Sequence, residues 1–306
     1  MSILTVATVA GAQRGRTQRQ LAALAAQTIA AQIEVVVVDT RPRLDPIDPP
    51  GSLDVKVLQD GSLSFGAARA EAVRAARTEI VAFLEDHCYP EPSWAEALAG
   101  AYRGPWVSVG YAVGNANPDC RGSRLTHMAH YGEWESPLRG PASSLPGNNV
   151  SYRRRTLLDL GPDLAAMLMA DYNIHARLRR EGLPLASEPA AQVLHENEGV
   201  LDGCRAALAY SRVLAVERAR LEGWSRGRRL THAVTIVFAG PLFRLARLAR
   251  AKRRRPGALA LLAAYLPGLL TQYLSSALGE SLGCLFGPGR GVAQLMYWEV
   301  DAPRGG

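Results

Sequence analysis

Cysteine is scarce in this chain of 306 residues, which holds only four, scattered without a CxxC pair. This spacing indicates neither a zinc site nor a disulfide framework, so a reducing compartment is the simpler expectation. The first residues carry no leading positive charge, and their apolar run alternates as in a β-strand. We therefore expect a first strand rather than a signal peptide, and we place the N-terminal domain that this strand opens in the cytoplasm.

Long uninterrupted apolar runs are also missing. Residues 231–243 and 257–286 are apolar, but Gly240-Pro241 interrupts the first, and Pro267 and Glu280 the second. Neither offers the roughly 20 consecutive apolar residues that a bilayer span normally requires. The pattern predicts helices that lie in or dip into a membrane interface. Packing on the rest of the chain, an oligomer interface and a re-entrant hairpin stay open.

The net charge of +7 is unevenly distributed. Residues 1–200 hold 19 Lys and Arg against 22 Asp and Glu, whereas residues 201–306 hold 16 against 6. Seven of the cations lie within residues 244–255, where arginines suit anionic lipid headgroups. No recognised nucleic-acid-binding motif and no cluster of aromatic residues for base stacking accompanies this run, so nucleic-acid binding is disfavoured.

The first part of the chain has the order of an α/β domain. A short β-branched run at 2–9, helical spacing at 17–32 and the apolar run at 33–40 predict a βαβ opening. A Pro-rich loop at 42–51 precedes a short strand at 55–58. Composition, with 48% apolar and 21% charged residues, excludes a disordered chain.

Polar residues follow two of the predicted strands. Asp39 ends the strand at 33–40, and Glu85, Asp86 and His87 come at the end of the strand at 79–86. Ligands of open α/β sheets bind beyond the carboxyl ends of the strands, so these side chains are candidate contacts. The Gly-, Asn- and Pro-rich region 114–147 has little periodicity, and we expect loops around an acceptor site there.

Six segments in this order resemble glycosyltransferase family 2, over about residues 1–200. They read VVVVDT, FGAARAEAVRAA, EIVAFLEDH, LPGNNVSYRRRTLL, ADYNIHARLRREG and VLHENE. The resemblance implies the GT-A fold, a mixed and mostly parallel sheet flanked by helices, as a catalytic domain over residues 1–202. Residues 203–306 would then form a helical, membrane-associating region.

The resemblance also implies a nucleotide-diphosphate-sugar donor and the residues that contact it. Asp39 matches the acidic residue that contacts the nucleotide base, although a strand-end carboxylate also caps turns. Arg69 matches an arginine that faces the diphosphate. Glu85 and Asp86 occupy the position of the DXD motif, and the glycine-polar loop corresponds to Gly147 and Asn148. Arg69 as a solvated helix residue is the alternative.

A divalent metal is implied as well, with Glu85, His87 and His195 as ligands. The family's outer acidic residue is a histidine here, at position 87. Mg²⁺ prefers oxygen ligands, whereas Mn²⁺ accepts imidazole, so Mn²⁺ is favoured over Mg²⁺. A structural histidine at a strand end is the alternative for His195.

Asp171 matches the position of the family's general base, which accepts the proton of the acceptor hydroxyl. The glutamate that precedes it in the family is Ala170 here. Asp171 also opens a predicted amphipathic helix, so a role as N-cap is the alternative.

Together these features predict an inverting hexosyltransferase on the cytoplasmic face of the cell membrane, held there in a peripheral or monotopic manner. Its acceptor would be a lipid-linked or cell-envelope saccharide. The alternative is a catalytically inactive relative that serves as a binding or scaffold protein.

Overall fold

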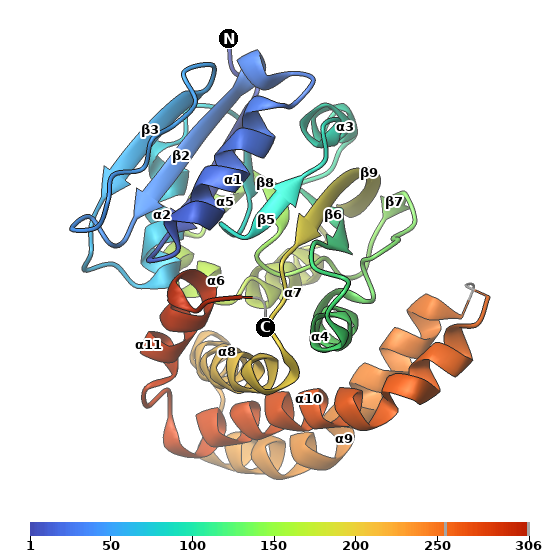
Figure 1. Ribbon diagram of the computed structural model, residues 1–306. Helices are drawn as coiled ribbons and strands as arrows, with labels where there is room; N and C mark the ends of the chain where they lie inside the picture. The colour runs from blue at the N-terminus through green and yellow to red at the C-terminus, as the bar shows by residue number, and fades with distance from the viewer. Residues whose placement is uncertain (254–255, 305–306) are drawn as a thin grey trace. The chain divides into compact units, whose positions relative to one another are not determined.

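The computed structural model describes residues 1–253 and 256–304, which fall into two compact units (Figure 1). The sheet unit comprises residues 1–116, 136–195 and 299–302. The helical unit comprises the described residues of 117–135, 196–298 and 303–306. The chain thus passes between the units several times, whereas the sequence predicts one boundary after residue 202.

The sheet unit is built on a nine-stranded sheet in the described part of the chain, with the order β3-β2-β1-β4-β8-β6-β9-β5 and with β7 paired to β9. The strands are β1 (Leu4–Ala10), β2 (Ile33–Asp39), β3 (Asp54–Gln59), β4 (Ile80–Phe83), β5 (Cys88–Pro90), β6 (Ser108–Asn115), β7 (Gly140–Pro141), β8 (Val150–Arg153) and β9 (Leu185–His195).

The first half of this sheet is parallel, as the βαβ opening predicts. β1 pairs in parallel with β2 and β4, and β2 pairs in parallel with β3. Every residue of β1 and β2 is buried, which suits their apolar sequences because helices cover parallel strands on both faces. The second half is mixed: β8 is antiparallel to β4 and β6, while β6 and β9 are parallel.

Short helices connect these strands. They are α1 (Arg14–Ala25), α2 (Phe65–Ala75), α3 (Trp94–Ala101), α5 (Arg154–Leu158), α6 (Leu164–Leu168) and α7 (Tyr172–Arg180), with the 3₁₀ turns η1 (Ala30–Gln32) and η2 (Gly161–Asp163). Ser64 caps α2 by accepting from the Ala67 N–H. Gly66 lets α2 approach α6 closely, because a Cβ there would overlap the carbonyl oxygen of Ala165.

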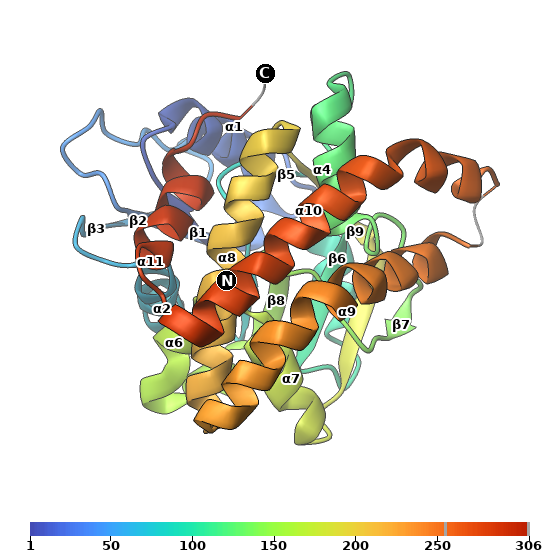
Figure 2. The same cartoon turned by 90° about the horizontal axis from the view of Figure 1, so that it is seen from below.

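The helical unit contains α4 (Arg121–Tyr131), α8 (Val200–Leu221), α9 (Arg226–Lys252), α10 (Ala258–Phe286) and α11 (Gly291–Met296), which the π-helical turn η3 (Tyr297–Asp301) follows. α10 packs along both α8 and α9 (Figure 2). Gly279 and Gly283 allow the close contact with α8, because a Cβ at either would overlap the carbonyl oxygens of Leu208 and Arg212.

The expectation of loops throughout 114–147 is wrong, because residues 121–131 form α4. Leu125 and Met128 of this helix join a buried apolar cluster with Leu248, Leu262, Leu269 and Tyr273. Local sequence favours this helix little, and packing of one apolar face stabilises it.

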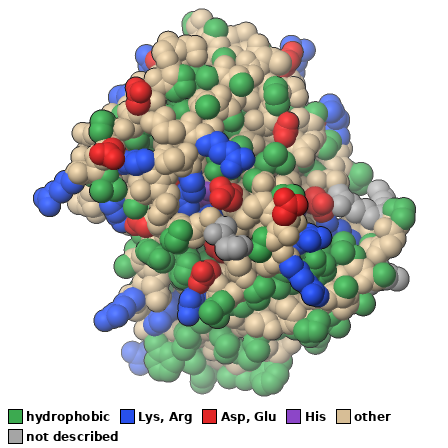
Figure 3. Space-filling model, viewed as in Figure 1, with side chains coloured by type: hydrophobic (Ala, Val, Ile, Leu, Met, Phe, Trp, Pro, Cys, Tyr) green, Lys and Arg blue, Asp and Glu red, His purple; other side chains and the backbone are tan. Residues whose placement is uncertain are grey.

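The expectation that Gly240-Pro241 interrupts the first apolar segment is also wrong, since α9 continues through Pro241 and α10 through Pro267. By length and composition, the helices at 226–252 and 260–286 could each cross a membrane, which is weak evidence of membrane insertion. Hydrophobic side chains gather over α9 and α10 in Figure 3. Arg254 and Arg255 of the basic run lie outside the described residues.

Candidate functional site

The predicted contacts lie at one edge of the sheet unit, where three parallel strands end. β1, β2 and β4 run in the same direction, with Ala10 beside Asp39 and Ala7 beside Phe83. Residues 84–87 continue directly from β4. The carboxyl ends of neighbouring parallel strands are where open α/β sheets bind ligands.

Pairing of β5 with β9 brings the two predicted metal-ligating histidines together. β5 follows His87 at once and runs antiparallel to β9, so that Cys88 lies opposite His195. The Nε2 atoms of His87 and His195 are 3.2 Å apart, although 108 residues separate them. The sheet topology therefore completes a cluster that the sequence predicts from two distant segments.

Glu85 completes this cluster, and all three side chains are buried. Its Oε2 lies 3.3 Å from Nε2 of His195 and 3.8 Å from Nε2 of His87. Ligands about 2.1 Å from a metal in tetrahedral geometry are roughly 3.4 Å from one another, so these separations suit a shared cation. One carboxylate and two imidazoles fit Mn²⁺ or another borderline ion better than Mg²⁺.

Asp86 orients His87 towards this point. Its Oδ1 lies 2.9 Å from Nδ1 of His87, which directs Nε2 to Glu85 and His195. The Arg16 guanidinium lies 3.2 Å from the same carboxylate and holds it in place. A carboxylate bonded to the second nitrogen of a metal-ligating imidazole fixes both its tautomer and its direction.

Two asparagines hold Glu85. Asn148 Nδ2 donates to Oε1 over 2.8 Å, and Asn149 Nδ2 donates to Oε2. Burial alone would raise the pKa of Glu85, but a hydrogen bond with His195 and the charges of His87 and His195 lower the pKa well below its usual range. Glu85 is therefore a carboxylate, the form that binds metal.

Arg69 and Asp171 form a buried ion pair beside this cluster. Two nitrogens of Arg69 lie 2.5 and 2.7 Å from the two oxygens of Asp171, and Asp171 has no exposed surface. The charge of Asp171 raises the pKa of Arg69 against the lowering effect of burial. Both carboxylate oxygens of the predicted base are thus engaged with a cation.

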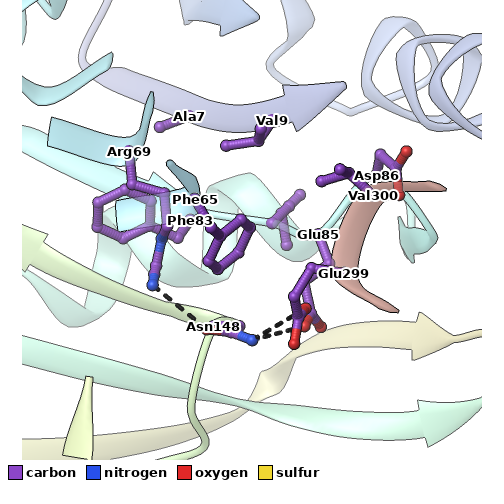
Figure 4. Close-up of a pocket in the computed structure, with 11 residues that line it drawn as sticks. Ala7, Val9, Phe65, Arg69, Phe83, Glu85, Asp86, Asn148, Glu299 and Val300 are labelled. Carbon is purple, nitrogen blue, oxygen red and sulfur yellow. Dashed lines mark hydrogen bonds between the residues drawn. The ribbon is translucent and has the colours of Figure 1, made fainter. Parts of the chain in front are cut away.

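Asn148 links the ion pair to the cluster (Figure 4). Its Oδ1 accepts from Arg69 over 3.2 Å, and its backbone N–H donates to Asp171 over 3.2 Å. Among the described residues, it is the only non-glycine with a positive φ, of 61°. Asparagine tolerates this left-handed conformation better than most residues, and such conformations cluster at functional sites.

A pocket lies beside these groups, and four of the predicted donor contacts line it: Arg69, Glu85, Asp86 and Asn148. His87 and His195 are not among its lining residues. Asp39 is buried apart from this lining, in a two-bond ion pair with Arg14 at 2.9 and 3.0 Å. The complete lining is Ala7, Val9, Phe65, Arg69, Phe83, Leu84, Glu85, Asp86, Asn148, Glu299 and Val300.

Gly147 lies in the turn before Asn148, where its carbonyl oxygen accepts from the Asn149 N–H over 2.7 Å. Among described residues it does not belong to the pocket lining.

Sequence reasoning missed Arg16, Asn149 and the pocket residues Glu299 and Val300. The Arg14-Gly15-Arg16 segment, which forms the start of α1, is a modest signal for anion contacts. Glu299 carries no such signal, because it lies more than 200 residues beyond Glu85 and outside every recognised motif. Only the folded chain brings it to the pocket.

Comparison with protein families places this site in context. Residues 14–157 match the family model described as glycosyl transferase family 2. A 153-residue stretch is 29% identical to the pre-mycofactocin glycosyltransferase of Mycobacterium tuberculosis, in two strains. The match covers 47% of this chain and 33% of that relative, so the chain matches about one third of the length of its curated relatives.

Solved structures share the fold at low sequence identity. The mannosyltransferase PcManGT from Pyrobaculum calidifontis, in complex with GDP-Man and Mn²⁺, gives a TM-score of 0.51 at 16% identity, over 92% of this chain and 87% of that one. S. aureus TarS 1–349 gives 0.46 at 15% identity, over 92% and 90%. The likeness to the mannosyltransferase confirms the predicted GT-A fold.

Proposed function

We propose, from the match of residues 14–157 to the family model of glycosyl transferase family 2, that the protein transfers a sugar from a nucleotide-diphosphate donor to a hydroxyl group. The observation that carries the proposal is the convergence of Glu85, His87 and His195 at the carboxyl edge of the sheet. A nucleotide-sugar presents a diphosphate, and a cation held by these residues would neutralise the charge that develops on it as the leaving group departs. Mn²⁺ is the favoured ion.

The remaining residues support specific roles in binding. Arg69 faces the pocket next to Asn148 and is the group we assign to the donor diphosphate. Asp86 positions His87, and Asp39 with Gly147 and Asn148 stays assigned to the nucleotide and sugar as a proposal. The low polarity around Phe65 and Phe83 strengthens these charged contacts.

Asp171 stays our proposal for the general base, in a transfer that inverts the anomeric carbon by direct displacement. Because Asp171 is paired with Arg69, it can act as a base only after that ion pair loosens. When the donor diphosphate attracts the Arg69 guanidinium, one oxygen of Asp171 is released to accept the proton of the acceptor hydroxyl. Base activity would then depend on the bound donor.

We further propose that the helical unit attaches the protein to the cytoplasmic face of a membrane, where it meets a lipid-linked or cell-envelope saccharide. Exposed apolar side chains repeat every four residues on α9 at Val234, Phe238 and Leu242. On α10 they repeat at Leu270, Leu274 and Leu278. Such stripes suit burial in the lipid interface.

Several cations of α9 form ion pairs within the protein, so they support lipid binding less strongly than the sequence predicts. Arg244 is paired with Glu280 over 3.0 Å, Arg247 with Glu133 over 2.7 Å, and Lys252 with Glu135. Paired cations attract headgroups weakly, so the apolar stripes carry most of the proposed attachment.

Calorimetry with a panel of UDP-sugars and GDP-sugars, in Mn²⁺, in Mg²⁺ and in chelator, tests the proposal. We expect one donor to bind, with affinity lost in chelator. Absence of binding to the whole panel by folded protein would contradict the proposal.

A catalytically inactive binding or scaffold protein is the second candidate, favoured by Ala170 at the family's glutamate position and by the engaged oxygens of Asp171. Donor hydrolysis separates the two: binding without release of nucleoside diphosphate, even with acceptor saccharides present, would favour the inactive protein.

A further inference from the structure

A four-residue segment, Glu299–Ala302, lies within the sheet unit although some 100 residues separate it from the preceding part of that unit. We call it the strap. Glu299 and Val300 line the pocket, and Val300 and Ala302 are almost completely buried. The strap therefore occupies part of the space at the sheet edge where the donor would bind.

The loop after β1 packs closely against the strap and is hydrogen-bonded to it. The Ala12 N–H donates to Oδ1 of Asp301 over 2.9 Å, and Gln13 Nε2 donates to the Asp301 carbonyl oxygen over 3.0 Å. Gly11 permits this approach, because a Cβ at that position would overlap the carbonyl oxygen of Val300.

Two arginines bind the same segment. The Arg41 guanidinium pairs with the carboxylate of Asp301. Arg16 donates to the carbonyl oxygens of Val300 over 2.9 Å and of Ala302 over 2.8 Å, while it also contacts Asp86. The strap thus presents one carboxylate and two carbonyl oxygens to a backbone N–H and two guanidinium groups, the donors that commonly bind phosphate oxygens.

The other end of the strap reaches the proposed metal ligands. Asn148 Nδ2 donates to Oε2 of Glu299 over 3.3 Å and to Glu85 over 2.8 Å (Figure 4). Glu299 and Glu85 are also hydrogen-bonded to each other. The same asparagine amide therefore holds both Glu85, a proposed metal ligand, and Glu299 of the strap.

We propose that the strap is an internal competitor of the nucleotide-sugar, and that Arg16, Arg41 and the Ala12 N–H are donor-binding groups that it occupies. This inference rests on the proposed function, since the competing ligand is the nucleoside diphosphate of the donor. Only the fraction of molecules with the strap released binds donor, and the apparent dissociation constant rises by the inverse of that fraction.

Removal of the two strap carboxylates tests the proposal. The double variant Glu299→Ala/Asp301→Ala keeps the backbone but loses the contacts with Asn148, Ala12 and Arg41. Its matched control, Asp202→Ala/Glu217→Ala, removes one Asp and one Glu whose ion pairs lie within α8. Calorimetry with UDP-glucose, UDP-GlcNAc and GDP-mannose in Mn²⁺ should show at least tenfold tighter donor binding by the strap variant, with the control equal to wild type.

Amide hydrogen exchange on the wild-type protein gives a second measurement that does not depend on the variant. A bound donor should speed exchange at residues 299–302. Equal donor affinity of the strap variant and wild type would contradict the proposal that the strap competes with the donor. Slower or unchanged exchange on donor binding would contradict it as well. Neither result would contradict the proposed sugar transfer. Weaker binding by the variant would overturn it too, because the segment would then belong to the donor site. If neither protein binds any donor, both proposals fall.

Discussion

The Nε2 atoms of His87 and His195 face each other across 3.2 Å, and the Glu85 carboxylate lies within 4 Å of both. A hydrogen bond between the two imidazoles joins one nitrogen as donor to the other as acceptor. A cation satisfies both together with the carboxylate. The arrangement of all three side chains, and not any one of them alone, therefore predicts a metal site.

Replacement of a histidine in this cluster should abolish tight metal binding. His195→Ala removes one of three protein ligands, and we expect Mn²⁺ affinity to fall at least 100-fold, measured by titration with electron paramagnetic resonance. His130→Ala in α4 is the control, with unchanged affinity expected. Equal Mn²⁺ binding by the His195 variant would remove the cluster from consideration as a metal site.

The contact between Asp86 and His87 predicts a smaller effect. Asp86→Asn keeps the size of the side chain but weakens its hold on the Nδ1–H group, so Mn²⁺ affinity should fall by roughly 10- to 100-fold. The same titration checks it. A loss as large as that of His195→Ala would instead indicate that Asp86 is itself a ligand.

The ion pair between Arg69 and Asp171 predicts both a catalytic and a stability effect. Asp171→Asn should abolish sugar transfer, and the uncompensated buried arginine should lower the free energy of unfolding by about 3–5 kcal/mol. Urea unfolding measures this loss. The double variant Arg69→Met/Asp171→Leu, which removes both charges, should be more stable than Asp171→Asn.

Donor binding by folded Asp171→Asn protein separates the two roles of this residue. Retained donor affinity without transfer supports a base, whereas undiminished transfer would show that another group accepts the proton.

His175 predicts a pH dependence of stability. Burial lowers its pKa from 6.5 to about 4, with Asp171 opposing and Arg179 and Arg69 adding to the shift. Between these pH values the unfolded chain binds a proton that the native protein does not, so the free energy of unfolding rises with pH. The contribution of this histidine is complete above pH 6.5, and about 3 kcal/mol of it is lost as the pH falls to 4.

Urea unfolding of wild type and His175→Gln at intervals between pH 4 and 7 measures this dependence. The variant should lose the corresponding part of the slope, whereas His130→Gln should retain it. Parallel pH profiles for wild type and His175→Gln would contradict the prediction.

The exposed stripe on α9 predicts where a membrane would be contacted. Phe238 is 75% exposed, and its transfer into lipid contributes on the order of 2 kcal/mol. Phe238→Glu should therefore lower partitioning onto liposomes at least tenfold, measured by flotation. Leu138→Glu, at a residue that is 69% exposed in the sheet unit, is the control. Equal flotation of Phe238→Glu and wild type would indicate that α9 serves another purpose.

The sequence by itself determined the parallel first half of the sheet, because uninterrupted β-branched runs such as Ile33–Val38 tolerate burial on both faces. It also determined that two acidic residues and a histidine follow β4, since these residues come directly after the strand in the sequence and before Pro90 and Pro92. Local patterns carry this information because each involves neighbours along the chain.

Tertiary structure decided what depends on distant segments. α4 forms on packing of Leu125 and Met128, which the loop-like composition around it concealed. α9 continues through Pro241 because its contacts with α10 outweigh one missing backbone hydrogen bond. Pairing of β5 with β9 set the distance between His87 and His195, and the return of residues 299–302 to the sheet unit placed Glu299 beside Glu85. No local pattern encodes these distances, because they follow from strand order and from packing between residues far apart in the chain.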